Sequence, residues 1–144
     1  MKFYSTNRKV AEVDLAEALM MGQAKDKGLY MPESLPSLPS ELKARARDMS
    51  YPELAVAVLT PYTDGVFSPS VLAEICFDAY NYDVPLEQIA GNRYVMRLDQ
   101  RPTASFKDFA ARFMGRAIGR LVRERGRELV HRGPHVLQLR LRRG

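Results

Sequence analysis

The sequence contains a single cysteine, Cys76, so no intramolecular disulfide can form, and one thiol fits a reducing compartment. No stretch approaches the roughly 20 apolar residues that a transmembrane helix needs. The first ten residues lack the apolar segment of a signal peptide. Internal repeats and low-complexity runs are also missing. The sequence therefore predicts a cytoplasmic, untargeted chain that folds without a disulfide scaffold.

Size and composition are those of one globular domain, or of a piece of a larger one. The chain has 144 residues, of which 46% are apolar and 27% are charged. A domain of this length buries roughly two-thirds of the surface of its unfolded chain, so a core can form without metal ions or disulfides.

The positive charge is concentrated at the C-terminus. The formal net charge is +5, yet residues 131–144 hold four arginines and no acid, while the other 130 residues carry 18 basic and 17 acidic groups. A basic tail could contact nucleic acid or a partner protein, which is an alternative function for the chain. The nearly neutral body gives no sign of nucleic-acid binding.

Capping signals predict a helix-rich N-terminal part. Expected helices begin after Asp14, Ser40, Ser50 and Ser68, each a residue type that caps helix N-termini. The strongest signal is residues 50–53 (SYPE), which combine a capping box with proline in the first turn. Gly22 is expected to end the first helix, and residues 27–32 are expected to form a turn and a short strand.

An αβ layer is predicted in the C-terminal half. Residues 94–98 alternate and favour a strand, and residues 128–130 resemble the opening of another. Between them lies the longest periodic signal, a helix with apolar residues at helical spacing from Phe106 to Val122 and a stop at Gly126. The fold class is therefore α/β.

Two side chains, those of Cys76 and Lys107, are candidate nucleophiles. Cys76 lies on an apolar helix face with no His, Lys or Arg within a turn, which indicates a small buried hydrophobe. Lys107 is expected in the first turn of the long helix, between Phe106 and Phe109. An amine attacks a carbonyl only when neutral, and a helix N-terminus favours the neutral form, whereas Asp108 favours the charged one. A solvated lysine is the ordinary alternative.

Two blocks of sequence resemble the threonine synthases. Residues 102–110 (PTASFKDFA) resemble the segment around the lysine to which these enzymes attach pyridoxal phosphate. Residues 16–22 (AEALMMG) and 26–36 (DKGLYMPESLP), preceded by 4–7 (YSTN), resemble the N-terminal signature of the same family. The family belongs to the fold type II, tryptophan-synthase-β-like class, and the resemblance covers residues 1–130.

The resemblance implies an activity and its residues. The family is a group of lyases in threonine biosynthesis that convert O-phospho-L-homoserine and water to L-threonine and phosphate with pyridoxal phosphate as electron sink. Lys107 would carry the cofactor and move protons, and Phe106 would lie beside it. No metal is implied. Residues 1–90 would form an α-rich N-terminal domain and 91–130 the first strand and helix of an incomplete fold type II pyridoxal-phosphate domain, while oligomeric state is not indicated.

The sequence departs from the family at two turns. Arg101 stands where glycine commonly precedes Pro-Thr, and Lys27 stands where Asp-Gly-Gly is usual. A side chain at a position that needs positive φ costs roughly 1 kcal/mol or more. Alternatively, Arg101 could bind the phosphate of the substrate.

Residues 131–144 do not resemble the family. Its phosphate-binding loop, rich in Gly, Ser and Thr, has no counterpart after Val130, so we expect a truncated or frameshifted fragment that is inactive alone and exposes the apolar face of its long helix. The tail could instead be an edge strand, because residues 137–142 alternate, or a basic arm. A metal site at His131 and His135 is not expected, because Gly133 and Pro134 interrupt a helix.

Overall fold

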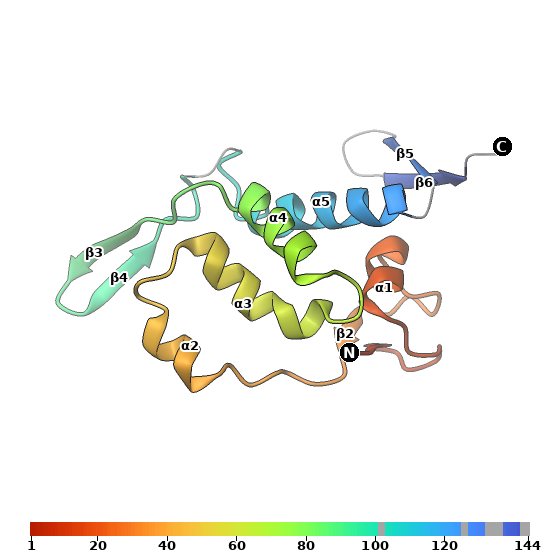
Figure 1. The fold of residues 1–144 in the computed structure, drawn as a ribbon, viewed down its shortest axis with the longest axis horizontal. Helices are drawn as coiled ribbons and strands as arrows, with labels where there is room; N and C mark the ends of the chain where they lie inside the picture. The colour runs from red at the N-terminus through yellow and green to blue at the C-terminus, as the bar shows by residue number, and fades with distance from the viewer. Residues whose placement is uncertain (101–102, 125–126, 132–136, 142–144) are drawn as a thin grey trace.

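Five helices and six short strands make up the part of the chain that the structure describes. The structure is a computed structural model that describes residues 1–100, 103–124, 127–131 and 137–141 (Figure 1). In chain order the elements are β1 (Phe3–Ser5), α1 (Leu15–Met21), β2 (Tyr30–Pro32), α2 (Ser40–Arg45), α3 (Tyr51–Thr63), α4 (Pro69–Ala79), β3 (Leu86–Ala90), β4 (Arg93–Met96), α5 (Asp108–Glu124), β5 (Arg127–His131) and β6 (Leu137–Leu141). The strands pair into three antiparallel sheets of two strands each, β1 with β2, β3 with β4 and β5 with β6.

Helix α1 and strand β2 lie where the sequence predicts them, and α1 has the predicted caps. The Asp14 carboxylate accepts a hydrogen bond from the Glu17 amide at 2.7 Å, and Gly22 ends the helix at a φ of +70°. β2 pairs with β1 so that Tyr4 lies opposite Met31. The strand β1 was not predicted, because three residues give no periodic signal and its partner lies far along the chain.

Helices α3 and α4 begin directly after their predicted capping residues, and α2 begins one residue earlier than predicted. In α3 both the amide and the hydroxyl of Ser50 donate to the Glu53 carboxylate, at 2.7 and 2.6 Å. In α4 the Ser68 hydroxyl accepts from the Val71 amide at 3.3 Å. Ser40, which was expected to cap α2, is instead its first residue, and that helix buries none of its side chains.

The core lies where α4 packs between α3 and α5 (Figure 1). One face of α4 is buried, in agreement with the prediction, and Cys76 is 0% exposed. The buried members of this cluster are Ala16, Phe67, Leu72, Ile75, Cys76, Ala79, Tyr80, Ala117 and Leu121. Tyr80 also belongs to a group of five aromatic rings in mutual contact, formed by Tyr51, Tyr80, Tyr82, Phe109 and Phe113.

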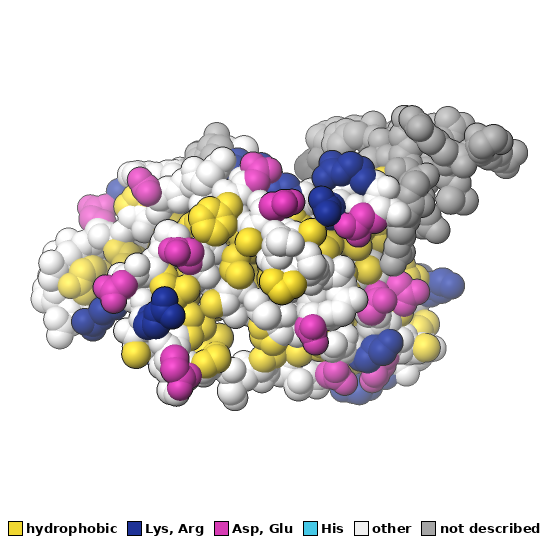
Figure 2. Space-filling view, in the orientation of Figure 1, with side chains coloured by type: hydrophobic (Ala, Val, Ile, Leu, Met, Phe, Trp, Pro, Cys, Tyr) yellow, Lys and Arg dark blue, Asp and Glu magenta, His cyan; other side chains and the backbone are white. Residues whose placement is uncertain are grey.

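The predicted strand at residues 94–98 is β4, but its environment differs from the prediction. β4 pairs antiparallel with β3, a strand that was not predicted, and both are exposed along their whole length. The hairpin projects away from the helices, and Figure 2 shows hydrophobic atoms on its surface at the left. Arg97 ties its base by pairing with Glu87 at 2.6 Å and with Asp99 at 2.7 Å.

The long helix α5 begins two residues later than its apolar spacing indicates. Phe106 lies before the helix and is 65% exposed, and Met114 is 45% exposed. The second half of the apolar face is covered: Ala117, Ile118, Leu121 and Val122 are all buried. The expectation that the whole face is exposed was therefore wrong for its C-terminal half. Gly126 lies outside the described residues.

The C-terminal strands β5 and β6 pair antiparallel, with Leu129 opposite Leu139. The predicted opening strand at 128–130 lies within β5, and β6 agrees with the strand reading of the tail. Residues 132–136 and 142–144 lie outside the described part, so the expectation that His131 and His135 form no metal site is not tested. No described helix is long and apolar enough to cross a membrane.

Candidate functional site

Lys107 lies immediately before α5 rather than in its first turn. Its carbonyl oxygen accepts from the amides of Ala110 at 3.1 Å and Ala111 at 2.8 Å, so Lys107 takes the N-cap position. The prediction of a first-turn lysine was therefore wrong by one position. The side chain is exposed, and among the described residues its amine has no hydrogen bond or ion pair. An accessible amine that is not held in an ion pair can reach a carbonyl compound, and it attacks in its neutral form.

The turn before Lys107 is closed by a buried carboxylate. Asp108 is 6% exposed, and its oxygens accept from the Thr103 amide at 3.0 Å and the Thr103 hydroxyl at 2.7 Å. Between them Ala104 has a φ of +54°, a left-handed conformation that costs a non-glycine residue about 1 kcal/mol. The carboxylate next to Lys107 in the sequence therefore binds Thr103, and no ion pair between described residues joins it to the lysine.

The backbone amides at the start of α5 are already occupied. The Lys107 amide donates to the Ser105 hydroxyl at 3.3 Å, and the Asp108 and Phe109 amides donate to the carbonyl oxygens of Ser105 and Phe106 at 3.1 and 3.3 Å. Free amides at a helix start can bind a phosphate, but these three are engaged within the turn. The Phe106 ring is exposed beside Lys107, where it can contact a bound ligand instead of the core.

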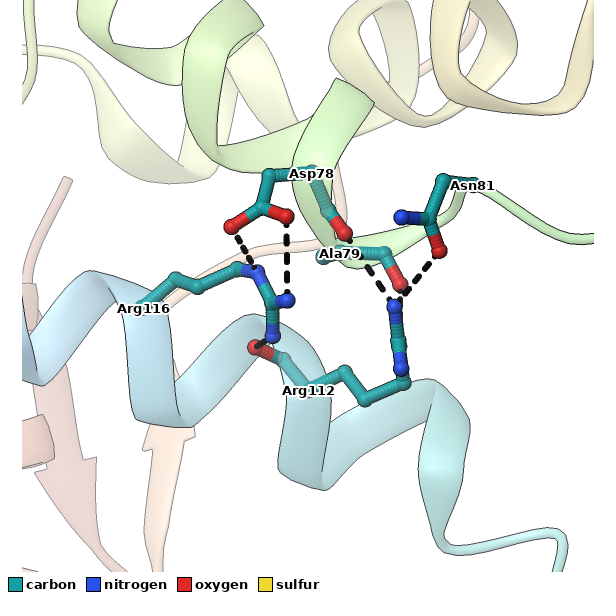
Figure 3. Close-up of polar contacts among 5 residues, drawn as sticks. All are labelled: Asp78, Ala79, Asn81, Arg112 and Arg116. Carbon is teal, nitrogen blue, oxygen red and sulfur yellow. Dashed lines mark hydrogen bonds and ion pairs between the residues drawn. The ribbon is translucent and has the colours of Figure 1, made fainter. Parts of the chain in front are cut away.

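The helix that follows Lys107 is fastened to the N-terminal part of the chain by two arginines (Figure 3). The Arg112 guanidinium donates to the carbonyl oxygens of Ala79 at 2.7 Å and Asp78 at 3.2 Å, and to the Asn81 side chain at 2.6 Å. The last carbonyls of a helix have no partner within it, so Arg112 caps α4 from a neighbouring helix. Arg116 forms a bidentate pair with the Asp78 carboxylate at 2.5 and 3.1 Å.

Further contacts strengthen this junction. The Arg116 guanidinium lowers the pKa of Asp78 below its usual value through these hydrogen bonds. The Tyr80 hydroxyl donates to the Phe109 carbonyl oxygen at 3.1 Å, and burial raises the pKa of Tyr80. Sequence reasoning missed these contacts. The spacing of Arg112 and Arg116 by four residues places them on one helix face, which is also typical of ordinary solvated arginines.

The N-terminal blocks that carried the resemblance meet around Asp26. Its carboxylate accepts from the Ser5 hydroxyl at 2.6 Å, the Gly28 amide at 3.0 Å and the Lys9 amide at 2.9 Å. A Cβ at position 28 would collide with the Ser5 hydroxyl, so this turn requires glycine. Lys27 has a φ of +67°, as expected for a position where glycine is usual. The contacts of Asp26 therefore hold this turn against β1.

Comparison with known proteins decides the family. A family model described as the threonine synthase N terminus matches residues 2–80, more than half of the chain. The chain belongs to the threonine synthase family. The threonine synthase of Pseudomonas aeruginosa is 33% identical to it over 138 residues, which cover 92% of this chain and 29% of the relative. That of Schizosaccharomyces pombe is 30% identical over 78% of this chain and 23% of the relative.

Solved threonine synthases share the fold. A crystal structure of threonine synthase from Brucella melitensis with pyridoxal phosphate bound superposes with a TM-score of 0.82 at 34% identity, covering 88% of this chain and 28% of the other. The Escherichia coli structure gives a TM-score of 0.79 at 23% identity, which supports the fold alone. The chain thus has the mixed helix and strand fold of part of a threonine synthase and spans less than a third of the length of these relatives.

Proposed function

We propose that this chain serves threonine synthesis from O-phospho-L-homoserine and water, and that Lys107 is the residue to which pyridoxal phosphate is attached. The observation that carries the proposal is the Lys107 amine, which is exposed and unpaired among the described residues at the start of α5. Family membership and the crystal structure of a relative with bound pyridoxal phosphate support it. We also propose residues 1–90 as the N-terminal domain and 91–130 as the start of the cofactor domain.

The described residues fit covalent attachment of the cofactor. Pyridoxal phosphate carries an aldehyde that a primary amine can attack, and its ring, once bound, withdraws electrons from the substrate carbon. Lys107 would hold the cofactor and, when released, take up and return protons at Nζ. The exposed ring of Phe106 would contact the cofactor. The amides that open α5 are occupied, so they are not proposed as donors to its phosphate.

The described surroundings of Lys107 are open to solvent. Phe106 and Lys107 are both exposed, and a closed active site protects its reactive groups from side reactions with bulk solvent. We therefore expect the chain alone to attach pyridoxal phosphate but to release no measurable phosphate from O-phospho-L-homoserine. Phosphate release by the chain, lost in Lys107→Arg, would show instead that it is a complete catalyst.

Reductive labelling tests the attachment residue. The chain is incubated with pyridoxal phosphate and borohydride, digested, and the label on each lysine is quantified by mass spectrometry. We expect Lys107 to carry most of the label in the wild type and in Lys43→Arg, a control at an exposed lysine of α2, and the label to disappear in Lys107→Arg. Label spread evenly over the lysines would contradict the proposal.

A further inference from the structure

The contact between Thr103 and Asp108 closes the turn that carries Lys107. Both carboxylate oxygens of Asp108 are used, Oδ2 by the Thr103 amide at 3.0 Å and Oδ1 by the Thr103 hydroxyl at 2.7 Å. The carboxylate is almost fully buried, and a buried carboxylate requires such donors. We refer to these two hydrogen bonds as the Thr103–Asp108 clasp.

The clasp determines whether the Asp108 carboxylate can pair with the Lys107 amine. A carboxylate one residue from a lysine is close enough to attract its ammonium group, and an ion pair would favour the charged, unreactive form. In the structure the Asp108 carboxylate turns to Thr103, and the Lys107 side chain remains exposed. The left-handed Ala104 lies inside the closed turn, so the clasp also maintains a backbone conformation that would otherwise relax.

We propose that Thr103 and Asp108 are positioning residues, whose clasp keeps the Asp108 carboxylate away from Lys107 and presents the lysine amine to solvent for attack on a carbonyl compound. The identification of that compound as pyridoxal phosphate rests on the function proposed above. The effect of the clasp on the amine itself does not rest on it. Neither residue is assigned a role in bond making or bond breaking.

Substitutions at Thr103 test the contribution of the clasp without removing other contacts of the fold. Thr103→Val keeps the size of the side chain and the backbone donor but removes the hydroxyl bound to Asp108 Oδ1. Thr103→Ser keeps the hydroxyl and should restore the contact. Thr60→Val is the matched control, because the Thr60 hydroxyl donates to the Val56 carbonyl oxygen on α3, away from Lys107.

Acetylation by N-hydroxysuccinimidyl acetate measures the availability of the amine without the cofactor. The rate at Lys107 is expressed relative to that at Lys43 in the same sample. We expect Thr103→Val to lower this ratio by up to about fivefold, because the freed carboxylate would then hold Lys107 in its charged form through an exposed ion pair. Thr103→Ser and Thr60→Val should stay within about twofold of the wild type. An unchanged ratio in Thr103→Val would overturn the proposal.

Hydrogen exchange of the amides of residues 103–108 provides a second readout in the same variants. The amides of Thr103 and Asp108 are bonded within the turn, so Thr103→Val should accelerate their exchange about tenfold while α4 remains protected. Exchange that accelerates throughout the chain would indicate a general loss of structure and would overturn a local role. If acetylation and exchange respond as expected but pyridoxal phosphate labels other lysines, the proposed function fails and the clasp stands.

Discussion

Arg112 of α5 donates from its Nε atom to the carbonyl oxygen of Ala79, the last residue of α4, at 2.7 Å. The two residues are 33 positions apart in the sequence. A positive group at a helix C-terminus stabilises both the unpaired carbonyls and the helix dipole. Since Arg112 lies little more than one turn beyond Lys107, this contact fixes the start of α5, which Lys107 precedes, to the core of the N-terminal helices (Figure 3).

Removing this cap should destabilise the chain measurably. Arg112→Ala deletes the donors to Ala79, Asp78 and Asn81, and we expect the free energy of unfolding to fall by about 2 kcal/mol. Arg123→Ala, at an exposed arginine in the last turn of the same helix, should change it by no more than about 0.5 kcal/mol. Urea unfolding of both variants measures the difference. Equal effects would show that the cap contributes nothing specific.

The left-handed backbone at Lys27 predicts a stabilising substitution. Lys27 has a φ of +67°, which glycine adopts without steric cost. Lys27→Gly should raise the free energy of unfolding by roughly 0.5–1 kcal/mol, since relief of the strained conformation exceeds the added flexibility of the unfolded chain. Thermal unfolding detects a change of this size. Lys25→Gly, at an exposed lysine of the same loop whose φ is not positive, should destabilise, and a stabilisation there as well would contradict the argument.

Contacts between residues close in the sequence can be predicted from it, whereas contacts between distant residues cannot. Capping contacts such as Ser50 with Glu53 join residues three apart, so the helix starts could be read from local sequence. Arg112 and Ala79 meet only because α4 and α5 pack together, and nothing in the local sequence around either residue specifies the other. The short strands β1 and β3 were missed for the same reason, because each depends on a partner strand for its stability.

In the candidate site, too, the sequence predicts some features and misses others. Lys107 could be selected as the candidate attachment residue from its motif, since motif residues follow one another in the chain. The start of α5 was misplaced because the apolar spacing includes Phe106, whereas the clasp between Thr103 and Asp108 holds residues 103–107 in a turn. A left-handed conformation at Ala104 is not expected for alanine, so only the structure reveals the clasp.

The contacts of Asp26 predict a dependence of stability on pH. The Ser5 hydroxyl, followed by backbone amides, holds the pKa of Asp26 below its usual value of 3.8. A carboxyl whose pKa is lowered by folding stabilises the fold above the pKa of the unfolded chain, and this contribution is lost as the pH falls through the folded pKa. Asp26→Asn should therefore weaken the loss of stability below about pH 4.

Unfolding in urea between pH 2 and pH 6 measures this dependence. Asp48→Asn is the control, because the Asp48 side chain makes no hydrogen bond or ion pair within the described residues. The wild type and Asp48→Asn should lose stability in parallel on acidification. If Asp26→Asn follows the same curve, the contacts of Asp26 do not account for any of the acid sensitivity.

Burial should make the single cysteine unreactive in the folded chain. Cys76 is completely buried, and burial raises the pKa of its thiol to about 11. At pH 8 only about one thiol in a thousand would then be ionised, and access to it requires opening of the core. A thiol-specific colour reagent should react slowly in buffer and completely in guanidinium chloride. Rapid reaction of the folded chain would show that α4 does not pack as described.

The most direct test of the attachment site is NMR of chains labelled with carbon-13 at the ε carbon of lysine. The sequence has six lysines, so each signal can be assigned with single Lys→Arg variants. On addition of less than one equivalent of pyridoxal phosphate, we predict that the Lys107 signal alone moves and that Lys107→Arg shows no comparable change. If the lysine signals move together, or another lysine responds first, Lys107 is not the attachment residue.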